Sequence, residues 1–542
     1  MANITSNGTG GGNSNDGATW TGGSVPTSSD NAIIQNGHTV TQNAAHTFKS
    51  LKVESGGIWT ADGSNHLTLS GEDDSDFAFA IDGTYNHTNG TVVINNGGGG
   101  IAHAAIRAGD ATSTTGLYDL TISGGGTTCE IYNSTTIHRN MEAGGSTTVL
   151  RGALTVNGNL TVQGTLTTIF SSTSHNLTVT GTTDVTGTLT CNASTISLGS
   201  GKSDDYALKG SGTVNFGTGT NTVGAVQTTS ASGITKTSGT ITFNTTKTGG
   251  QSIGPNVSNV NSHFNFGTST VNFDLSGGFG TLFGIEQHVG SSKTFTITAA
   301  TVNFKSNGRI YQNNSDTNIV KIIGDLVIDA SKTLTTYFDN ADDFGSKLEV
   351  TGDVTLNGTL NAYSASNPKP MDFGSLVIAG GGTYSATSGT TTITNEKSGH
   401  AWKNNGGTFT HNNGKVLIDF DTGNLAQSTE VKENTFYDLE VKLDQAGYEL
   451  RLEDHSSTNA MDILNNLTVT KGIFDTMTKS DTLTIHGQTI IESDGVFTQA
   501  DHDTNKIIHN GIVRNSGTYK INNGTTVKMN GGIRNLGTIT VA

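Results

Sequence analysis

The chain has 542 residues, of which 73 are glycine, 4 are proline and only 14% are charged, and its formal net charge is −16. Glycine is far above its average share of about 7%, and charged residues fall well below the usual figure of about 25%. The acidic balance argues against nucleic-acid binding, which needs Lys and Arg opposite the phosphates, and low charge with little proline is unlike a disordered chain.

The opening of the chain, residues 1–47, predicts a cap on a first β-coil and an attachment region. It combines a large aromatic residue, Trp20, with a turn at Pro26 and a short apolar strand at residues 32–34. A stack of coils needs such a cap because its end strands present unpaired edges. The opening lacks the basic and apolar regions of a secretory signal, and no apolar run approaches the roughly 20 residues of a membrane span. We therefore expect cytoplasmic synthesis without a signal peptide and no membrane insertion.

Residues 48–360 predict the main body of an all-β, elongated β-solenoid (β-helix) built from short Gly/Thr/Asn-rich repeats. Within residues 152–166, aliphatic side chains alternate with threonines. This alternation predicts that one set points inward, namely Leu154, Val156, Leu160 and Val162, and that Thr155 and Thr161 point outward. Helical periodicity is nearly absent, and the best helical candidate, residues 101–108, is limited by its flanking glycines to a turn or two.

A longer duplication links this body to the C-terminal part of the chain. Residues 83–94 match residues 407–418, and in each copy a second shared phrase follows, at 117–122 and at 436–441. His87 and His411 occupy equivalent places, so we predict similar local structures and matching surroundings for the two histidines. A repeated packing role is favoured over a ligand or switch role.

Residues 361–373 predict a break and residues 374–542 predict C-terminal β-solenoid repeats. The break holds two of the four prolines, Pro368 and Pro370, and proline cannot donate to a β-ladder. In the C-terminal repeats, Arg514 and Arg534 recur 20 residues apart, which is a plausible length for one three-sided coil and indicates stacked positions rather than a ligand site.

The sequence predicts no catalytic, cofactor or metal site. Solvated loops are favoured for the acidic clusters, which are Glu72–Asp76, then Asp339, Asp342 and Asp343, and finally Asp501–Asn505. The last cluster begins like a calcium loop, but Lys506 and Ile512 stand where that loop needs Gly and Glu. Cys129 and Cys191 lie in no Cys/His cluster, which argues against zinc and favours buried free thiols over a disulfide.

Two further patterns, a threonine-rich strand and the three tryptophans, also favour structural roles over binding sites. Thr294–Thr298 resembles the flat threonine arrays of ice-binding solenoids, but its rows are short and irregular, which favours a solvated strand face. The three tryptophans, Trp20, Trp59 and Trp402, are scattered, whereas a carbohydrate-binding platform shows local clustering of aromatic residues. The prediction is therefore a chain that is not an enzyme.

The chain resembles β-solenoid virion proteins of bacteriophages. The N-terminal phrase from Trp20 to Val40 has a W-x-G-G-x-x-P-x-x-x-D pattern that is similar to the opening of many β-helical surface and virion proteins. The phrases at 436–441 and 466–469 are similar to phrases in Gly/Thr/Asn-rich phage proteins. The resemblance lies in composition and recurring phrases over most of the chain rather than in a specific motif, and no functional residue carries over from it.

The resemblance implies a structural protein of a phage particle, of the fibre, spike or head-decoration type, that presents an extended surface for host attachment. The implied partners are other virion proteins, further copies of the chain in a homo-oligomer, and a host cell-surface glycan or protein. Two alternatives stay open: a bacterial surface adhesin or extracellular filament subunit, and a polysaccharide depolymerase that uses paired carboxylates across coils.

Overall fold

The structure is a computed structural model. It describes residues 2–541 apart from residues 9–10, 62, 64, 74–76, 96–102, 108–116, 125–127, 146, 201–205, 245–252, 256–259, 275–283, 288–291, 313–317, 337–346, 365–367, 421–427, 445–446, 453–459, 477–481, 500–505 and 523–524. Two compact units divide the chain. The first comprises residues 1–257, 264–269 and 276–280, and the second comprises residues 258–263, 270–275 and 281–542.

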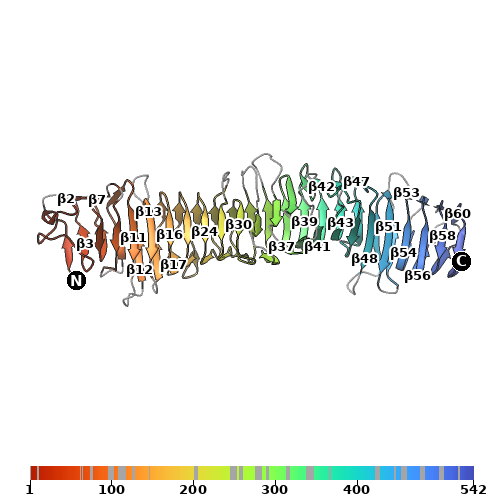
Figure 1. Cartoon of the computed structure of the whole chain (residues 1–542), viewed down its shortest axis with the longest axis horizontal. Coiled ribbons are helices and arrows are strands. Elements are labelled where there is room, and N and C mark those ends of the chain that lie inside the picture. Colours follow the sequence, from red (N-terminus) through yellow and green to blue (C-terminus); the bar gives the residue numbers. More distant parts are fainter. Residues whose placement is uncertain are drawn as a thin grey trace. The chain divides into compact units, whose positions relative to one another are not determined.

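Each unit is a stack of short parallel β-strands, so the predicted all-β β-solenoid is confirmed (Figure 1). One coil of the first unit consists of β23 (Leu177–Val179), β24 (Thr183–Val185) and β25 (Thr188–Thr190). The next coil consists of β26 (Ile196–Leu198), β27 (Leu208–Gly210) and β28 (Thr213–Asn215). Each strand pairs in parallel with its counterpart, β23 with β26, β24 with β27 and β25 with β28. The coil is therefore three-sided, and its backbone hydrogen bonds join it to the coils on either side.

The interior of the first unit is filled by the alternating aliphatic side chains. In β18 (Leu154–Val156) and β19 (Leu160–Val162), the four aliphatic side chains are at most 1% exposed. Thr155 and Thr161 lie between them on the outer face and are partly exposed. The predicted orientation of these six residues is confirmed. Each side chain packs on its counterparts in neighbouring coils, so no coil has a complete core by itself.

Glycines at the corners let neighbouring coils approach closely. A Cβ added at Gly187 would lie 2.0 Å from the carbonyl oxygen of Gly164, and one added at Gly212 would lie 2.2 Å from that of Gly187. These distances are shorter than any real contact, so a larger residue at this corner would push the coils apart. The recurring glycines in the sequence repeats therefore have a steric cause.

The first strands of the chain form the beginning of this stack. β1 (Asn3–Thr5) pairs with β3 (Asn31–Ile34), and β2 (Gly11–Asn13) pairs with β4 (Thr39–Gln42). The 3₁₀ helix η1 (Gly17–Thr19) follows β2, and the Asp16 carboxylate accepts a hydrogen bond from the backbone N–H of Ala18 at its start. Trp20 is fully buried and donates from Nε1 to the Ser14 carbonyl at 2.9 Å. The short strand expected at residues 32–34 is confirmed, and the attachment role of residues 1–47 stays a prediction.

The turn or two of helix considered for residues 101–108 is wrong. Residues 103–107 form β12 (His103–Arg107), which pairs in parallel with β9 (Phe77–Ile81) and with β14 (Thr128–Tyr132). Backbone pairing with strands on both sides satisfies more hydrogen-bonding groups than an isolated helical turn would. Neighbouring strands therefore override the local sequence pattern here.

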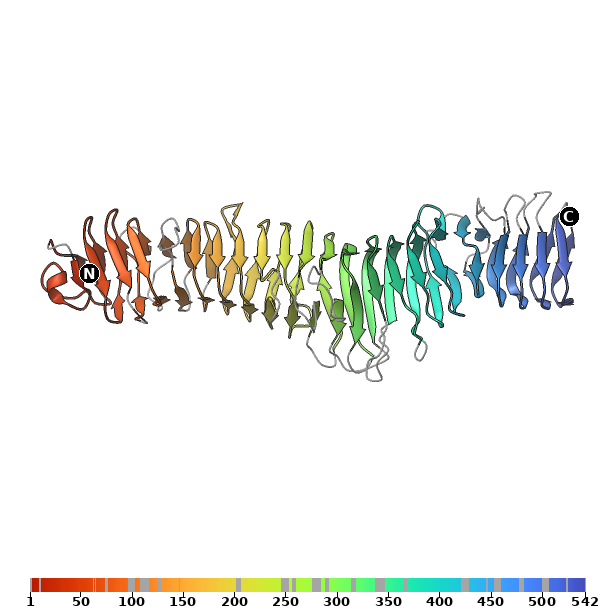
Figure 2. The ribbon, with the colours of Figure 1, turned by 90° about the horizontal axis from the view of Figure 1, so that it is seen from above.

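The second unit uses longer strands. β37 (Thr294–Phe304), β39 (Ile319–Ile328), β41 (Lys347–Leu356) and β43 (Met371–Ile378) lie side by side in this order (Figure 2). The register shifts between Thr298 and Thr301 in the β37–β39 pair and between Val350 and Asp353 in the β41–β43 pair. Irregularities of this kind bend a strand, so one long strand can serve two sides of a coil.

The proline-containing segment 361–373 overlaps the last residue of β42 (Thr359–Asn361) and the first three residues of β43. On either side of it, β41 pairs directly with β43, and β42 pairs with β44 (Thr383–Ser385). The chain thus passes from one coil to the next through this segment. The domain limits drawn at 47, 360 and 373 stay predictions.

Candidate functional surfaces

One side of the first unit carries a row of hydroxyl groups, one from each coil. The row runs through β15 (Thr135–Ile137), β18, β23, β26, β29 (Asn221–Val223) and β32 (Thr240–Phe243). Its members, in register from coil to coil, are Thr136, Thr155, Thr178, Ser197, Thr222 and Thr242. We call this row the threonine ladder. It is uncharged, and each member of the ladder lies between two buried residues of its strand.

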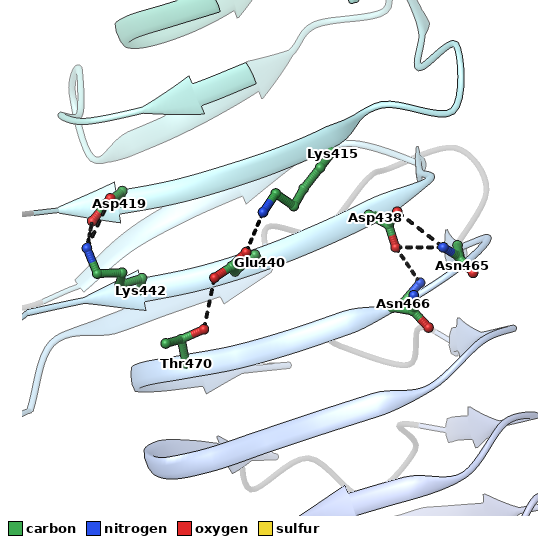
Figure 3. A network of polar contacts seen from close by, with 8 residues as sticks. All are labelled: Lys415, Asp419, Asp438, Glu440, Lys442, Asn465, Asn466 and Thr470. Atoms are coloured by element: carbon green, nitrogen blue, oxygen red, sulfur yellow. Dashed lines mark hydrogen bonds and ion pairs between the residues drawn. The ribbon is translucent and has the colours of Figure 1, made fainter. Parts of the chain in front are cut away.

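The second unit carries a face of alternating charges instead (Figure 3). It includes β48 (Lys415–Phe420), β51 (Asp438–Leu443) and β54 (Leu467–Asp475). Glu440 accepts from Lys415 Nζ at 2.7 Å and from the Thr470 hydroxyl at 3.0 Å, while Lys442 Nζ lies 2.9 Å from an Asp419 oxygen. Acid and base alternate between strands, so each charge meets its opposite on a neighbouring coil.

The same pattern continues over the preceding coils. Lys347 Nζ lies 2.8 Å from Glu349 and 2.6 Å from Asp372, and Lys397 Nζ lies 2.8 Å from Asp353. Partly exposed pairs of this kind contribute about 0–1 kcal/mol each. They also bear on register, because a slip of two residues that set Asp419 opposite Glu440 would bring like charges together. We call the side that runs through β39, β41, β43, β45 (Thr390–Ile393), β48, β51 and β54 the charged face, to which β45 contributes the uncharged Thr390 and Thr392.

The duplicated phrase forms the same local contact in both copies. The His87 ring lies 5.7 Å from the Tyr118 ring, and the His411 ring lies 5.6 Å from the Tyr437 ring. The aspartate after each tyrosine also has a repeated role: Asp119 accepts from the backbone N–H of Asn140 at 2.9 Å, and Asp438 accepts from that of Asn466 at 2.8 Å. The predicted match between the surroundings of the two histidines is confirmed at the ring contact, and the contact is one of packing.

The two copies differ in what lies on the other side of the histidine. The His87 ring lies 4.6 Å from the His138 ring, and neither ring nitrogen of His87 has a hydrogen-bond partner among the described residues. Burial, together with His138, lowers the pKa of His87. In the other copy, His411 Nδ1 accepts from the backbone N–H of Asn413 at 3.0 Å. The first copy therefore favours a neutral His87 imidazole.

Among the buried ionisable side chains of the described residues, Lys236, Glu433 and His509 are three that sequence reasoning missed. Lys236 is 3% exposed and donates to the Gly219 carbonyl at 2.6 Å. Glu433 is 7% exposed and accepts from Trp402 Nε1 at 3.1 Å. His509 is fully buried. Each stands two positions after a buried aliphatic residue, and these are Ile234, Val431 and Ile507. If the alternation of inward and outward side chains is continued past the end of each strand, it places these three residues on the inner face.

Burial sets the protonation of these interior groups. It lowers the pKa of Lys236 to about 8 and that of His509 to about 4, and it raises the pKa of Glu433. In each case the shift favours the neutral form, because a charge in the apolar interior loses its hydration. Each has at least one hydrogen bond to a neighbouring coil, so we interpret all three as structural.

The Lys236 environment predicts stabilisation at alkaline pH. The native chain releases this proton near pH 8 and the unfolded chain near 10.5, so between these values the unfolded state binds more protons and the free energy of unfolding rises with pH. The rise is about 3 kcal/mol over the whole window. Urea denaturation of the chain and of Lys236→Met between pH 7.5 and 10.5 measures it, since the variant should lose this rise. Lys209→Met, at a partly exposed position of the same unit, is the control; equal pH dependence in all three proteins would contradict the assignment.

The structure places the remaining sequence candidates as follows. Cys129 and Cys191 are buried free thiols, as predicted, and burial raises the pKa of each to about 12. Trp20, Trp59 and Trp402 are fully buried. Arg514 and Arg534 are register neighbours on β58 (Val513–Asn515) and β61 (Ile533–Asn535), which confirms them as stacked positions.

The acidic clusters lie largely outside the described residues. This holds for Asp74–Asp76, for Asp339, Asp342 and Asp343, and for Asp501–Asn505. Asp73 is described, and its carboxylate accepts from the backbone N–H of Phe77 at 3.0 Å. Over the part of the chain that is described, no group of three or more His, Cys, Asp or Glu side chains gathers in an arrangement that could hold a metal ion.

Comparisons with protein-family models, with curated proteins and with solved structures find no match to this chain. Within its described residues, no helix has the length and apolar character needed to cross a membrane. The fold class, a parallel β-solenoid, is therefore established by the structure itself.

Proposed function

We propose that this chain is a structural protein of a bacteriophage particle, a fibre, spike or head-decoration protein that presents an ordered surface for host attachment. The observation that carries the proposal is the coil-by-coil repetition of outward side chains, as a threonine ladder in the first unit and as a charged face in the second. A surface that repeats in this way can contact a partner over many coils without a recessed site. The interior beneath it is mainly apolar.

The state of the carboxylates supports a binding surface over a depolymerase. A glycosidase needs one carboxylic acid with a raised pKa and a second carboxylate near it, both open to the sugar. On the charged face, Glu440 and Asp419 are engaged by lysines. Glu433 has a raised pKa, but it is buried beneath Trp402 and Asn404. These groups suit register and packing better than proton transfer.

The proposed partners follow from the same role. Other virion proteins would hold the chain, further copies would form a homo-oligomer, and a host glycan or protein would meet the exposed faces. The site of assembly would be the host cytoplasm, with release in the particle.

The experiment is detection of the chain in purified particles. Particles from a lysed host culture are separated on a density gradient, and each fraction is probed with an antibody against the recombinant chain. We expect the chain to sediment with the capsid protein and immunogold label to decorate the particles. Label on intact cells or on capsid-free filaments would instead support the adhesin or filament alternative, and release of reducing ends from host glycans by the purified chain would support the depolymerase.

A further inference from the structure

A second side of the first unit carries threonines in two parallel rows rather than one. Its strands are β17 (Thr147–Leu150), β20 (Thr165–Thr167), β25, β28 and β31 (Ile234–Thr235). The first row consists of Thr147, Thr165, Thr188 and Thr213, and the second of Val149, Thr167, Thr190, Asn215 and Thr235. We call these nine residues the threonine grid. No register shift interrupts the pairs that form it.

The grid is regular in both directions. Along a strand, outward residues two positions apart are separated by about 6.6 Å, and neighbouring coils are about 4.8 Å apart. The residues between the two rows point inward and are at most 2% exposed, and they are Thr148, Leu166, Leu189, Val214 and Ile234. Packed inner residues hold the backbone in place, and β-branched side chains have few rotamers. The outer hydroxyls and methyls are thus held in a repeating pattern.

The grid is uncharged, and two of its hydroxyls have a partner within the chain: Thr167 accepts from Asn192 Nδ2 at 3.4 Å, and Thr235 donates to the Val214 carbonyl at 3.5 Å. The hydroxyls of Thr165, Thr188 and Thr190 have no side-chain hydrogen bond to another described residue of the chain. The whole chain has a net charge of −16, yet the grid consists of seven threonines, one valine and one asparagine. At its border, Arg151 stacks over Phe170 of the hairpin β21–β22 (Ile169–Phe170 and Thr173–Ser174).

Several kinds of partner fit this face poorly. A grid about 24 Å by 10 Å covers about 240 Å², well below the roughly 800 Å² per partner of a stable protein interface. Its side chains are short and similar in length, so none protrudes far enough to pack into a pocket of a second copy. The nine positions hold no aromatic ring on which a sugar or base could stack and no cation for a phosphate.

A crystalline water surface has the properties that the grid requires. Ice is flat, uncharged and periodic, its oxygens both donate and accept hydrogen bonds, and its oxygen rows repeat at distances close to those of the grid. Each threonine can hydrogen-bond one lattice water through its hydroxyl and release disordered water from its methyl. We propose that the threonine grid binds ice, as an activity separate from the proposed role in a particle.

One coil supplies the variants that test this. Thr188 lies in the centre of the first row of the grid, while Thr178 belongs to the single-row threonine ladder on another side of the same coil. Thr188→Lys therefore breaks the grid, and Thr178→Lys adds the same side chain and charge to the same coil outside it. Thr190→Tyr, in the second row, breaks the grid without adding a charge.

The experiment measures how much of the full chain is incorporated into ice. Polycrystalline ice is grown slowly on a cold finger from a dilute solution that also contains a reference protein. We expect the chain and Thr178→Lys to be enriched in the ice several-fold over the reference, and Thr188→Lys and Thr190→Tyr to fall to the level of the reference. Urea midpoints within error of the unmodified chain establish that each variant is folded.

Two results would overturn the proposal. One is exclusion of the unmodified chain from ice to the same extent as the reference protein. The other is equal ice incorporation of Thr188→Lys and Thr178→Lys; if sedimentation then showed a loss of mass only for Thr188→Lys, the grid would be a contact between copies. Neither result bears on whether the chain is found in phage particles.

Discussion

Replacing Leu160 with aspartate is expected to unfold the coils around it. Leu160 is fully buried in β19 and lies in register between Met141 and Thr183. An aspartate there leaves a cavity and an unpaired carboxylate in an apolar interior. We expect a loss of at least about 4 kcal/mol, seen as a large drop in the thermal midpoint with loss of β-sheet circular dichroism.

The matched control is Thr155→Asp, which lies on β18, the strand that precedes β19 in the same coil. Thr155 is an outward member of the threonine ladder, with Thr136 and Thr178 as register neighbours. A charge there stays in water and faces no like charge, so the stability should change by less than about 0.5 kcal/mol. A thermal midpoint of Leu160→Asp equal to that of the control would show that residue 160 does not face the core.

Acid is expected to destabilise the C-terminal coils through His509. Its Nδ1 lies 2.7 Å from the Thr489 hydroxyl and its Nε2 lies 3.0 Å from the Tyr519 hydroxyl. Burial lowers its pKa from 6.5 to about 4. Between these values the unfolded chain binds a proton that the native chain does not bind. The free energy of unfolding therefore falls as the pH is lowered from 6.5 to 4. The loss is about 3 kcal/mol.

Urea denaturation at pH 7 and pH 4.5 measures this loss. His509→Phe should be less stable at pH 7, because the buried hydroxyls of Thr489 and Tyr519 each lose a hydrogen bond, but it should lose less on acidification than the unmodified chain. His486→Phe is the control, since His486 is 43% exposed and paired with Asp462. If His509→Phe and His486→Phe responded to acid alike, the buried imidazole would not be the acid-sensitive group.

Much of the fold could be predicted from residues close together in the sequence. The alternation through Leu154 and Val156 predicts strands and their inner face, because side chains on a strand point to opposite sides in turn. The duplicated phrases predict matching surroundings for His87 and His411, because similar segments in similar coils pack similarly, and the structure supplies the shared contact with a tyrosine. In residues 101–108, however, the local pattern predicts a helix where neighbouring strands impose β12.

The order of residues across coils depends on the tertiary structure. Along the first row of the grid, Thr147, Thr165 and Thr188 are separated by 18 and then 23 residues, because a hairpin lengthens one coil. Since the coils differ in length, no fixed period in the sequence aligns them. Backbone pairing does, and it brings Lys415 to Glu440 on the charged face.

The sequence by itself therefore determined the class of fold, the inner and outer faces of its strands and the free state of its buried cysteines. Only the tertiary structure decided which outward residues form the threonine grid, the threonine ladder and the charged face, and which polar groups, such as Lys236, lie inside. The physical reason is that alternation is a property of one strand, whereas a surface row is a property of many strands whose register is set by hydrogen bonds between coils.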